Sequence, residues 1–259
     1  MNLDFKKYHG AGNDFILIDD RLLTFPTHDF QVIVKLCHRR FGIGADGLIL
    51  LQPSQKADFL FRIFNSDGKE AAMCGNGIRC LVHFAKSLGL DKDVYLVETQ
   101  NAILSCQMTE GKITSSYEYS RPSELSIKIG HHDVHVINTG VPHAVVFVET
   151  LDIPDFYHQA RDIRFHSLFQ PEGVNVNFVT VQSDQSLRCR TYERGVEDET
   201  LACGTGAVAV ATIAKQLYQI RGSIKVIPAS QDVLEVDIGV ESAQMTGPVH
   251  CVFTGSISL

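Results

Sequence analysis

The stretches Ala71-Ala72-Met73-Cys74-Gly75-Asn76-Gly77 and Leu201-Ala202-Cys203-Gly204-Thr205-Gly206 share the pattern Cys-Gly-x-Gly, preceded by small or apolar residues. They lie about half the chain apart in a sequence of 259 residues. An apolar run of helical length follows each of them, so we expect a helix to begin at each cysteine. The repeat predicts two similar halves, each organised around one such helix.

The two runs differ in their apolar pattern. After Cys74, apolar residues recur at three- and four-residue spacing as far as Leu88, and Gly89 is a helix terminator, which indicates a helix with one buried stripe. Residues 207–214, after Cys203, are apolar on all sides, which is typical of a helix buried around most of its circumference.

A cysteine at a helix start has distinct chemistry. The first backbone N–H groups of a helix lack partners within the helix, and the helix dipole favours negative charge there. An ordinary thiol pKa of about 8.5 is lowered at such a position, so thiolate forms more readily. The flanking glycines let backbone amides approach a carboxylate or phosphate closely. Two such turns facing one small substrate are what a racemase needs.

Composition narrows the class of protein. Hydrophobic residues make up 44% and charged residues 20%, and no apolar stretch approaches the roughly 20 residues of a membrane span. The first residues, 1–7, form no apolar signal core, so we expect a cytoplasmic protein. A net charge of −7 without a basic cluster argues against nucleic acid and for a small-molecule partner.

The seven cysteines are an odd number, scattered, with no C-x-x-C pair. This pattern argues against a disulfide framework and against a zinc ribbon. For five of them we expect a buried structural role; these are Cys37, Cys80, Cys106, Cys189 and Cys251.

Alternation and turn residues predict the remaining elements. Expected strands cover 3–8, 15–18, 48–51, 59–64, 94–97, 102–107, 112–118, 134–137, 144–148, 174–181, 187–192 and parts of 224–253. Expected helices cover 29–40, with Asp29 as N-cap, and part of 152–169. Polarity rises at 119–122, where a proline interrupts. We therefore assign 1–119 to an N-terminal lobe, completed by a C-terminal strand at about 250–259, and 120–249 to a C-terminal lobe.

Two further patterns are weak. Residues 42–47 formally match G-x-G-x-x-G, but they follow a helix and precede a strand, the reverse of a dinucleotide-binding fingerprint. His131, Asp133 and His135 would share one face of a strand, yet no further ligand accompanies them. We expect a solvated face there and no metal site.

Three residues outside the cysteine turns are candidates for the site. His143 follows Pro142 in an expected loop, where capping or packing is the ordinary role of a lone histidine. Asn65 and Glu193 precede Cys74 and Cys203 by similar distances, at the same strand end of each repeat. Their side chains are expected to point toward the thiols.

At this point the motifs resemble a known family. Their order and content are similar to diaminopimelate epimerase, the cofactor-independent two-cysteine enzyme of lysine and peptidoglycan biosynthesis. The motifs span nearly the full chain and comprise His9-Gly-Ala-Gly-Asn-Asp-Phe15, Phe41-Gly-Ile-Gly-Ala-Asp-Gly47, Phe64-Asn-Ser-Asp-Gly68, Met73-Cys-Gly-Asn-Gly-Ile-Arg79, Gly140-Val-Pro-His143, Gly173-Val-Asn-Val-Asn-Phe178, Tyr192-Glu-Arg-Gly195 and Ala202-Cys-Gly-Thr-Gly-Ala207.

The resemblance implies an α/β fold of two pseudo-symmetric lobes, each a curled β-sheet or barrel around a central helix, with the active site in the cleft between them. It implies Cys74 and Cys203 as the acid/base pair, assisted by His143 and Glu193, and no cofactor. The reacting carboxylate would be held by the turns Gly75, Asn76, Gly204 and Thr205. The rest of the substrate would be held by Asn13, Asn65, Asn175, Glu193 and Arg194. A homodimer is the candidate assembly, which the sequence does not decide.

Other functions stay open at this stage. A proline or hydroxyproline racemase is the second enzyme class, but the polar residues Asn65, Asn175 and Arg194 suit a distal zwitterion better than a proline ring. A thiol redox protein and an amino-acid-binding protein without catalysis are the alternatives from other classes.

Two departures from the family pattern bear on specificity. Many members have Gln where this chain has Gly47, and Asn where it has Val141. Loss of polar contacts weakens discrimination between substrates. We therefore expect this chain to tolerate amino acids other than diaminopimelate, such as glutamate; comparable turnover of the two in parallel assays would support this, and an absence of glutamate turnover would refute it.

Overall fold

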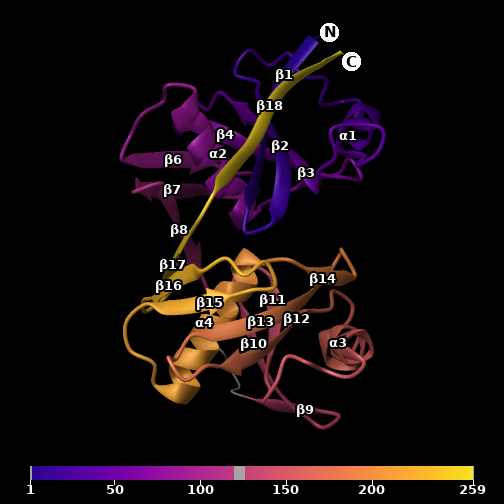
Figure 1. Ribbon diagram of the computed structural model, residues 1–259, viewed down its shortest axis with the longest axis vertical. Coiled ribbons are helices and arrows are strands. Elements are labelled where there is room, and N and C mark those ends of the chain that lie inside the picture. The colour runs from indigo at the N-terminus through magenta and orange to yellow at the C-terminus, as the bar shows by residue number, and fades with distance from the viewer. Residues whose placement is uncertain (1, 120–125, 259) are drawn as a thin grey trace. The chain divides into compact units, whose positions relative to one another are not determined.

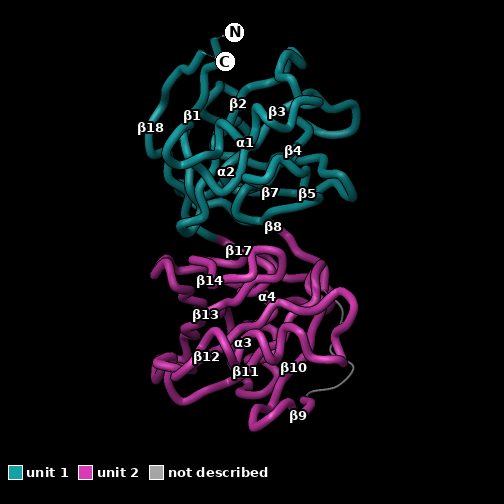
Figure 2. Tube along the Cα trace, turned by 90° about the vertical axis from the view of Figure 1, so that its right-hand side faces the viewer, with its two compact units in different colours: residues 1–115, 247–259 teal, residues 116–246 magenta. Residues whose placement is uncertain are grey.

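The computed structural model describes residues 2–119 and 126–258, which form two compact units (Figures 1 and 2). Unit 1 comprises Met1–Ser115 and Gly247–Leu259, and unit 2 comprises Ser116–Thr246. The proline-containing segment where we placed the end of the first lobe lies largely outside the described residues. The division into an N-terminal lobe at 1–119 and a C-terminal lobe at 120–249 stays a prediction.

Unit 1 is a mixed sheet with two helices. In chain order its elements are β1 (Asn2–Gly10), β2 (Asn13–Asp19), α1 (Phe30–Cys37), β3 (Gly47–Gln52), β4 (Phe59–Asn65), β5 (Glu70–Ala71), α2 (Gly75–Ser87), β6 (Val94–Glu98), β7 (Ile103–Thr109), β8 (Lys112–Glu118) and β18 (His250–Ser258). The chain passes into unit 2 within β8.

Unit 2 contains the remaining elements. They are β9 (Ile127–Ile129), β10 (His132–Asn138), β11 (Pro142–Phe147), α3 (Phe156–Arg164), the 3₁₀ turn η1 (Ser167–Phe169), β12 (Asn175–Val181), β13 (Leu187–Glu193), β14 (Asp198–Thr200), α4 (Gly204–Tyr218), β15 (Ile224–Ile227), β16 (Leu234–Ile238) and β17 (Ser242–Gly247).

The strand pairing of unit 1 recurs in unit 2. In unit 1, β1 pairs antiparallel with β2, β2 parallel with β3, β3 antiparallel with β4, and β4 parallel with β6. In unit 2 the same relations join β10 to β11, β11 to β12, β12 to β13, and β13 to β15. In each unit one helix, α1 or α3, connects the two strands of the first parallel pair. A second helix, α2 or α4, lies in the chain between the two strands of the second parallel pair. The repeat inferred from the two cysteines therefore extends over both units.

Helix α2 lies on one face of the unit 1 sheet, and α1 covers the other (Figure 1). Successive residues of a strand point to opposite faces. Accordingly Phe15 and Leu17 pack with α2, whereas Ile16 and Ile18 pack with α1. Strands β6 and β7 add Tyr95 and other buried side chains to the α2 side, so the sheet curls around that helix.

Helix α4 occupies the equivalent place in unit 2. It contacts β10, β11, β12, β13, β15 and β16, and every residue from 206 to 214 is buried. The prediction of a helix buried around most of its circumference is confirmed. Helix α3 packs on the opposite face, where Phe156 and Ile163 join the core with Val176 and Phe178 of β12.

The structure shortens several predicted segments. Between the strands expected at 3–8 and 15–18 the structure has only a two-residue turn, Ala11 and Gly12, both with positive φ, as a tight hairpin with right-handed strand twist requires. Helix α1 ends at Cys37, not residue 40, because the His38 ring accepts the N–H groups of Arg40 and Phe41 and turns the chain. Strand β11 begins at Pro142, two residues early, and the short strands β5, β9 and β14 were not predicted.

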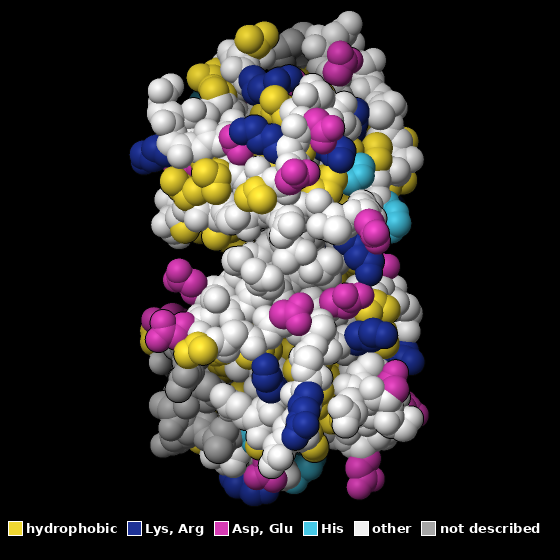
Figure 3. All heavy atoms as spheres, turned by 90° about the vertical axis from the view of Figure 1, so that its left-hand side faces the viewer, with side chains coloured by type: hydrophobic (Ala, Val, Ile, Leu, Met, Phe, Trp, Pro, Cys, Tyr) yellow, Lys and Arg dark blue, Asp and Glu magenta, His cyan; other side chains and the backbone are white. Residues whose placement is uncertain are grey.

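Charged side chains of both signs are interspersed on the face drawn in Figure 3. Among the described residues no helix is both long and apolar enough to cross a membrane. The expectation of a small-molecule partner in place of nucleic acid stays a prediction.

Candidate active site

Cys74 caps α2. It is the N-cap residue, in extended conformation, and its Sγ accepts the backbone N–H of Gly77 at 3.4 Å. A Cβ at Gly77 would lie 3.0 Å from Ile49 and 3.3 Å from Ile63 and Phe61, so glycine lets the helix start close to the sheet. The predicted placement of Cys74 at a helix N-terminus is confirmed.

Cys203 caps α4 in the same way. Its Sγ accepts the N–H of Gly206 at 3.4 Å. A Cβ at Gly206 would lie 2.7 Å from Asn177 Oδ1. Both thiols therefore sit where helix amides and dipole favour a thiolate, and no disulfide joins any cysteines of the described residues.

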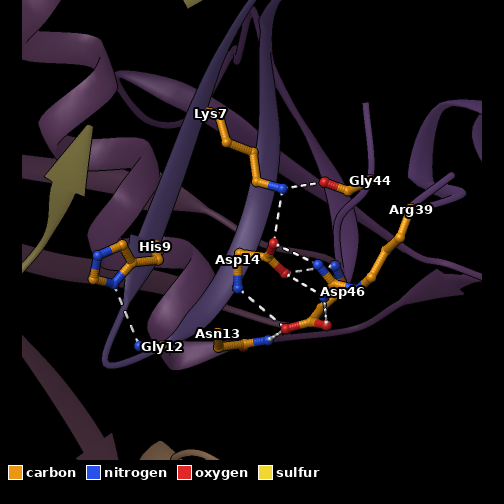
Figure 4. A network of polar contacts seen from close by, with 8 residues as sticks. All are labelled: Lys7, His9, Gly12, Asn13, Asp14, Arg39, Gly44 and Asp46. Carbon is orange, nitrogen blue, oxygen red and sulfur yellow. Dashed lines mark hydrogen bonds and ion pairs between the residues drawn. The ribbon is translucent and has the colours of Figure 1, made fainter. Parts of the chain in front are cut away.

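Asn13 lies against Cys74. It is held by Asp46, as Figure 4 shows. Asn13 Nδ2 donates to Asp46 Oδ2 at 2.7 Å, and the same carboxylate oxygen accepts the backbone N–H of Asp14 at 3.1 Å. Because the amide nitrogen is turned to the carboxylate, Asn13 Oδ1 is left to face Cys74, whose Sγ donates to it at 3.7 Å. The orientation of the Asn13 amide is thus set by a residue 33 positions away.

An ion network supports Asp46. Arg39 donates to both Asp14 carboxylate oxygens, at 2.9 and 2.8 Å, and to Asp46 at 2.6 Å. Lys7 is buried and pairs with Asp14 at 2.7 Å, and it also donates to the Gly44 carbonyl. Burial alone would raise the pKa of Asp14, but hydrogen bonds from Arg39 and Lys7 outweigh it and hold that pKa well below its usual range.

His143 is fully buried and neutral. Burial lowers its pKa to about 3, and the charge of Arg194 acts in the same direction. Asn177 Oδ1 accepts the Thr191 hydroxyl at 2.9 Å, so its Nδ2 is the donor to His143 Nδ1 at 3.2 Å. Nδ1 is therefore the unprotonated nitrogen, and the ring carries its proton on Nε2.

This tautomer directs a hydrogen bond toward Cys203. His143 Nε2 donates to Thr205 Oγ1 at 3.0 Å. The hydroxyl proton of Thr205 can then point to Cys203 Sγ, 3.4 Å away. Thr139 Oγ1 fixes the same turn by donating to the Thr205 carbonyl at 2.9 Å. His143 is thus connected to the Cys203 thiol through Thr205.

The polar residues at the ends of β12 and β13 also lie together. Asn175 is buried, and its Oδ1 accepts the backbone N–H of Arg194 at 2.7 Å. Glu193 accepts the Thr200 hydroxyl at 2.9 Å. Asn175 is the register neighbour of His143 in the parallel β11–β12 pair. His143 in turn contacts the start of α4 through Thr205.

The predicted site residues therefore fall into two local groups. Unit 1 holds Asn13, Asn65, Cys74, Gly75 and Asn76, with Asn65 exposed at the end of β4. Unit 2 holds His143, Asn175, Glu193, Arg194, Cys203, Gly204 and Thr205. The roles assigned to them remain proposals.

The alternative ligand set at 131–135 is not arranged for a metal. Among the residues that the structure describes, no three His, Cys, Asp or Glu side chains are grouped to hold one. His131 precedes β10, and Asp133 is paired with Lys128 at 2.9 Å.

Sequence reasoning missed two supporting residues. Asp46 lies in the segment 42–47, considered above for a cofactor, and nothing local links it to Asn13. Asn177 is a buried polar residue inside the mostly apolar strand β12, two positions from Asn175 and thus on the same face. A buried polar residue in such a strand is the signal that could have identified it.

The depressed pKa of His143 predicts a pH-dependent stability. Below about pH 6.5 the unfolded chain binds a proton at this residue, which the folded protein, with a pKa of about 3, does not bind. Stability contributed by neutral His143 is therefore lost as pH falls from about 6.5 toward 3. When the pH is lowered from 7 to 5, the unfolding free energy of the parent protein should fall by about 2 kcal/mol more than that of His143→Gln.

Urea unfolding at both pH values measures this difference. His158→Gln is the control, because His158 is largely exposed, and it should follow the parent profile. Equal pH dependence in His143→Gln and the parent protein would contradict the assignment of a neutral buried ring.

Comparison with known proteins extends these observations. The family model described as diaminopimelate epimerase matches residues 5–122 and 135–252. A diaminopimelate epimerase of Archaeoglobus fulgidus is 42% identical over 277 residues, covering 100% of this chain and 98% of the relative. One from Flavobacterium psychrophilum is 42% identical over 257 residues, covering 97% and 98%, and one from Aquifex aeolicus is 40% identical over 276 residues, covering 99% and 98%.

Solved structures share the fold at low sequence identity. A phenazine biosynthesis protein of the PhzF family from Enterococcus faecalis superposes with a TM-score of 0.78 at 13% identity, with 100% of both chains covered. A hydroxyproline epimerase from Agrobacterium vitis gives 0.71 at 17% identity, covering 100% of this chain and 93% of that one. These likenesses agree with the predicted α/β architecture of curled sheets around central helices. The full-length match to the family model and to relatives about 40% identical shows that this chain belongs to the diaminopimelate epimerase family.

Proposed function

We propose that this protein interconverts L,L- and meso-diaminopimelate, with Cys74 and Cys203 as the two bases. The observation that carries the proposal is that a cysteine sulfur caps each of two helices in the same way. Each sulfur lies 3.4 Å from the backbone nitrogen of the residue three positions later in the chain. Family membership supplies the substrate.

The chemistry follows from this capping. One sulfur, as thiolate, removes the α-proton, and the other, as thiol, delivers a proton to the opposite face. A single base would return the proton to the face from which it came. Because the α-proton is very weakly acidic, charge building on the carboxylate must be stabilised, and the amides at the starts of α2 and α4 are suited to this.

The remaining residues have supporting roles in this proposal. The turns Gly75-Asn76 and Gly204-Thr205 would hold the reacting carboxylate. The more distant end of the substrate would be held by Asn13, Asn65, Asn175, Glu193 and Arg194. Glu193 would also assist proton handling, whereas His143, neutral and bonded to Thr205, would position a hydroxyl toward Cys203.

Relaxed specificity for glutamate also stays a proposal. Position 47 is constrained by packing as well as by substrate, because a Cβ there would lie 2.6 Å from the carbonyl oxygen of Phe64. Restoring a glutamine at this position would therefore force the β3–β4 ladder to shift.

Proton NMR in D₂O under reducing conditions tests the reaction. We expect L,L-diaminopimelate to lose its α-proton signal while the meso isomer appears, and L-proline to remain unchanged. Cys74→Ala and Cys203→Ala should each abolish turnover. Binding of diaminopimelate without α-proton exchange would reject catalysis, and exchange of proline in its place would favour the second enzyme class.

The contact between Asp46 and Asn13 predicts a selective effect on binding. Asp46→Asn removes the carboxylate that fixes the Asn13 amide, so we expect a severalfold rise in KM with a smaller change in kcat. Asp58→Asn is the control, since that carboxylate pairs with Lys92 on another part of the unit. A parent-like KM in Asp46→Asn would exclude a role for the Asn13 orientation.

A homodimer and a cytoplasmic location complete the proposal. Exposed apolar side chains on β18, Val252 and Phe253, support a partner for this strand, and a second copy is the simplest one. Light scattering coupled to size-exclusion chromatography measures the assembly.

A further inference from the structure

Arg79 is a buried arginine that the proposed mechanism does not yet use. Its side chain is 0% exposed and is the largest of the fully buried side chains in the part of the protein that the structure describes. Nη2 donates to Asn76 Oδ1 at 2.7 Å and Nη1 to the Gly75 carbonyl at 3.4 Å. Within residues 2–119 and 126–258 Arg79 forms no ion pair, and its buried Nε has no hydrogen-bond partner.

A buried cation without an anion is costly. Moving a charge out of water carries an effective penalty of several kcal/mol unless a partner offsets it. The surrounding core is apolar, with Ile78, Leu81 and Val82 on the same helix. The partners that offset this cost in unit 1 are two neutral oxygens, the Gly75 carbonyl and Asn76 Oδ1.

The guanidinium lies at the start of α2. Helical side chains point back toward the N-terminus, so Arg79 returns to the first turn and contacts Gly75 and Asn76, the two residues after Cys74. Its charge therefore adds to the helix dipole at the place where Cys74 caps the helix. Because Arg79 donates to Asn76 Oδ1, the amide nitrogen of Asn76 points away from the guanidinium.

Helix α4 lacks this arrangement. Val208 occupies the position that follows Cys203 by the same number of residues, and Thr205 stands in place of Asn76. The His143 ring, which is joined to Cys203 through Thr205, is neutral, and the charge of Arg194 acts on that ring.

The other groups near Cys74 do not cancel Arg79. In the network behind Asn13, two carboxylates, Asp14 and Asp46, are matched by two cations, Lys7 and Arg39. The contact from Cys74 Sγ to Asn13 Oδ1 favours the protonated thiol, but it is long at 3.7 Å and joins groups without full charges.

The charge of Arg79 also lowers the pKa of two other thiols, against the effect of burial. Burial raises the pKa of Cys106 to about 12, and the charge of Arg79 opposes that rise. It also opposes the effect of burial at Cys80, the next residue on the helix.

We propose that Arg79 is the positioning residue that makes the start of α2 the stronger anion site, so that Cys74 ionises before Cys203 and the reacting carboxylate is held mainly at Gly75-Asn76. The carboxylate part rests on the proposed function. The order of ionisation does not, because it concerns the protein without substrate.

The first test needs no variant. The reduced protein is alkylated with iodoacetamide from pH 5 to 10, and peptide mass spectrometry follows Cys74 and Cys203 separately. We expect Cys74 to react with the lower pH midpoint. A lower midpoint for Cys203, or equal midpoints, would overturn the proposal.

Variants then assign the cause. In Arg79→Met, below the midpoint, alkylation of Cys74 should slow at least about tenfold, corresponding to one pH unit or more in midpoint, while Cys203 keeps its profile. Arg79→Lys should recover most of the parent rate. Arg62→Met is the matched control, because Arg62 is ion-paired with Glu70 in the same unit and should leave both thiols unchanged.

The remaining outcomes are equally decisive. An unchanged Cys74 profile in folded Arg79→Met, or equal shifts at both thiols, would refute a local role of the charge. If Arg79→Met does not fold, the proposal is judged on the two pH midpoints of the parent protein and on the rate of Cys74 alkylation in Arg79→Lys. In the NMR assay, Arg79→Met should lower kcat/KM at least about tenfold; a parent protein without α-proton exchange would reject the proposed function and leave the order of ionisation intact.

Discussion

The hydrogen bond from a backbone amide to a capping cysteine sulfur is the interaction on which the rest of this structure depends. It joins Gly77 to Cys74 and Gly206 to Cys203. A sulfur in that position replaces the oxygen of an ordinary N-cap side chain and is exposed to the unpaired amides and the dipole of the helix. The rest of each unit keeps that helix start in place.

Close packing provides this support. Because Gly77 and Gly206 lack a Cβ, α2 approaches Ile49 and Ile63, and α4 approaches Asn177, so closely that a Cβ would force these side chains to move. The sheets curl around helices whose central turns are buried. A small displacement of either helix would move sulfur and amides together, so the core and the reactive groups cannot be adjusted independently.

The duplicated architecture carries two chemically different helix starts. At α2, a buried guanidinium contacts the two residues after the thiol, and an ion network holds the side-chain amide that faces the thiol. At α4, a chain of neutral groups runs from Thr191 through Asn177 and His143 to Thr205. Inverting a stereocentre requires a base on one side and an acid on the other, and each thiol takes both roles as the reaction runs in its two directions.

Sequence alone determined the local features of this protein. Helices begin at Cys74 and Cys203 because capping, glycine and apolar periodicity act within a few residues of each other. The two-fold repeat and most strand positions were predicted for the same reason, whereas most candidate site residues were named from the resemblance of the motifs to a known family. Tertiary structure alone decided three features: the orientation of the Asn13 amide, the tautomer of His143 and, within the described residues, the lack of an ion pair for Arg79. Each depends on partners distant in sequence, such as Asp46 and Thr205, or on burial, and no local pattern encodes those contacts.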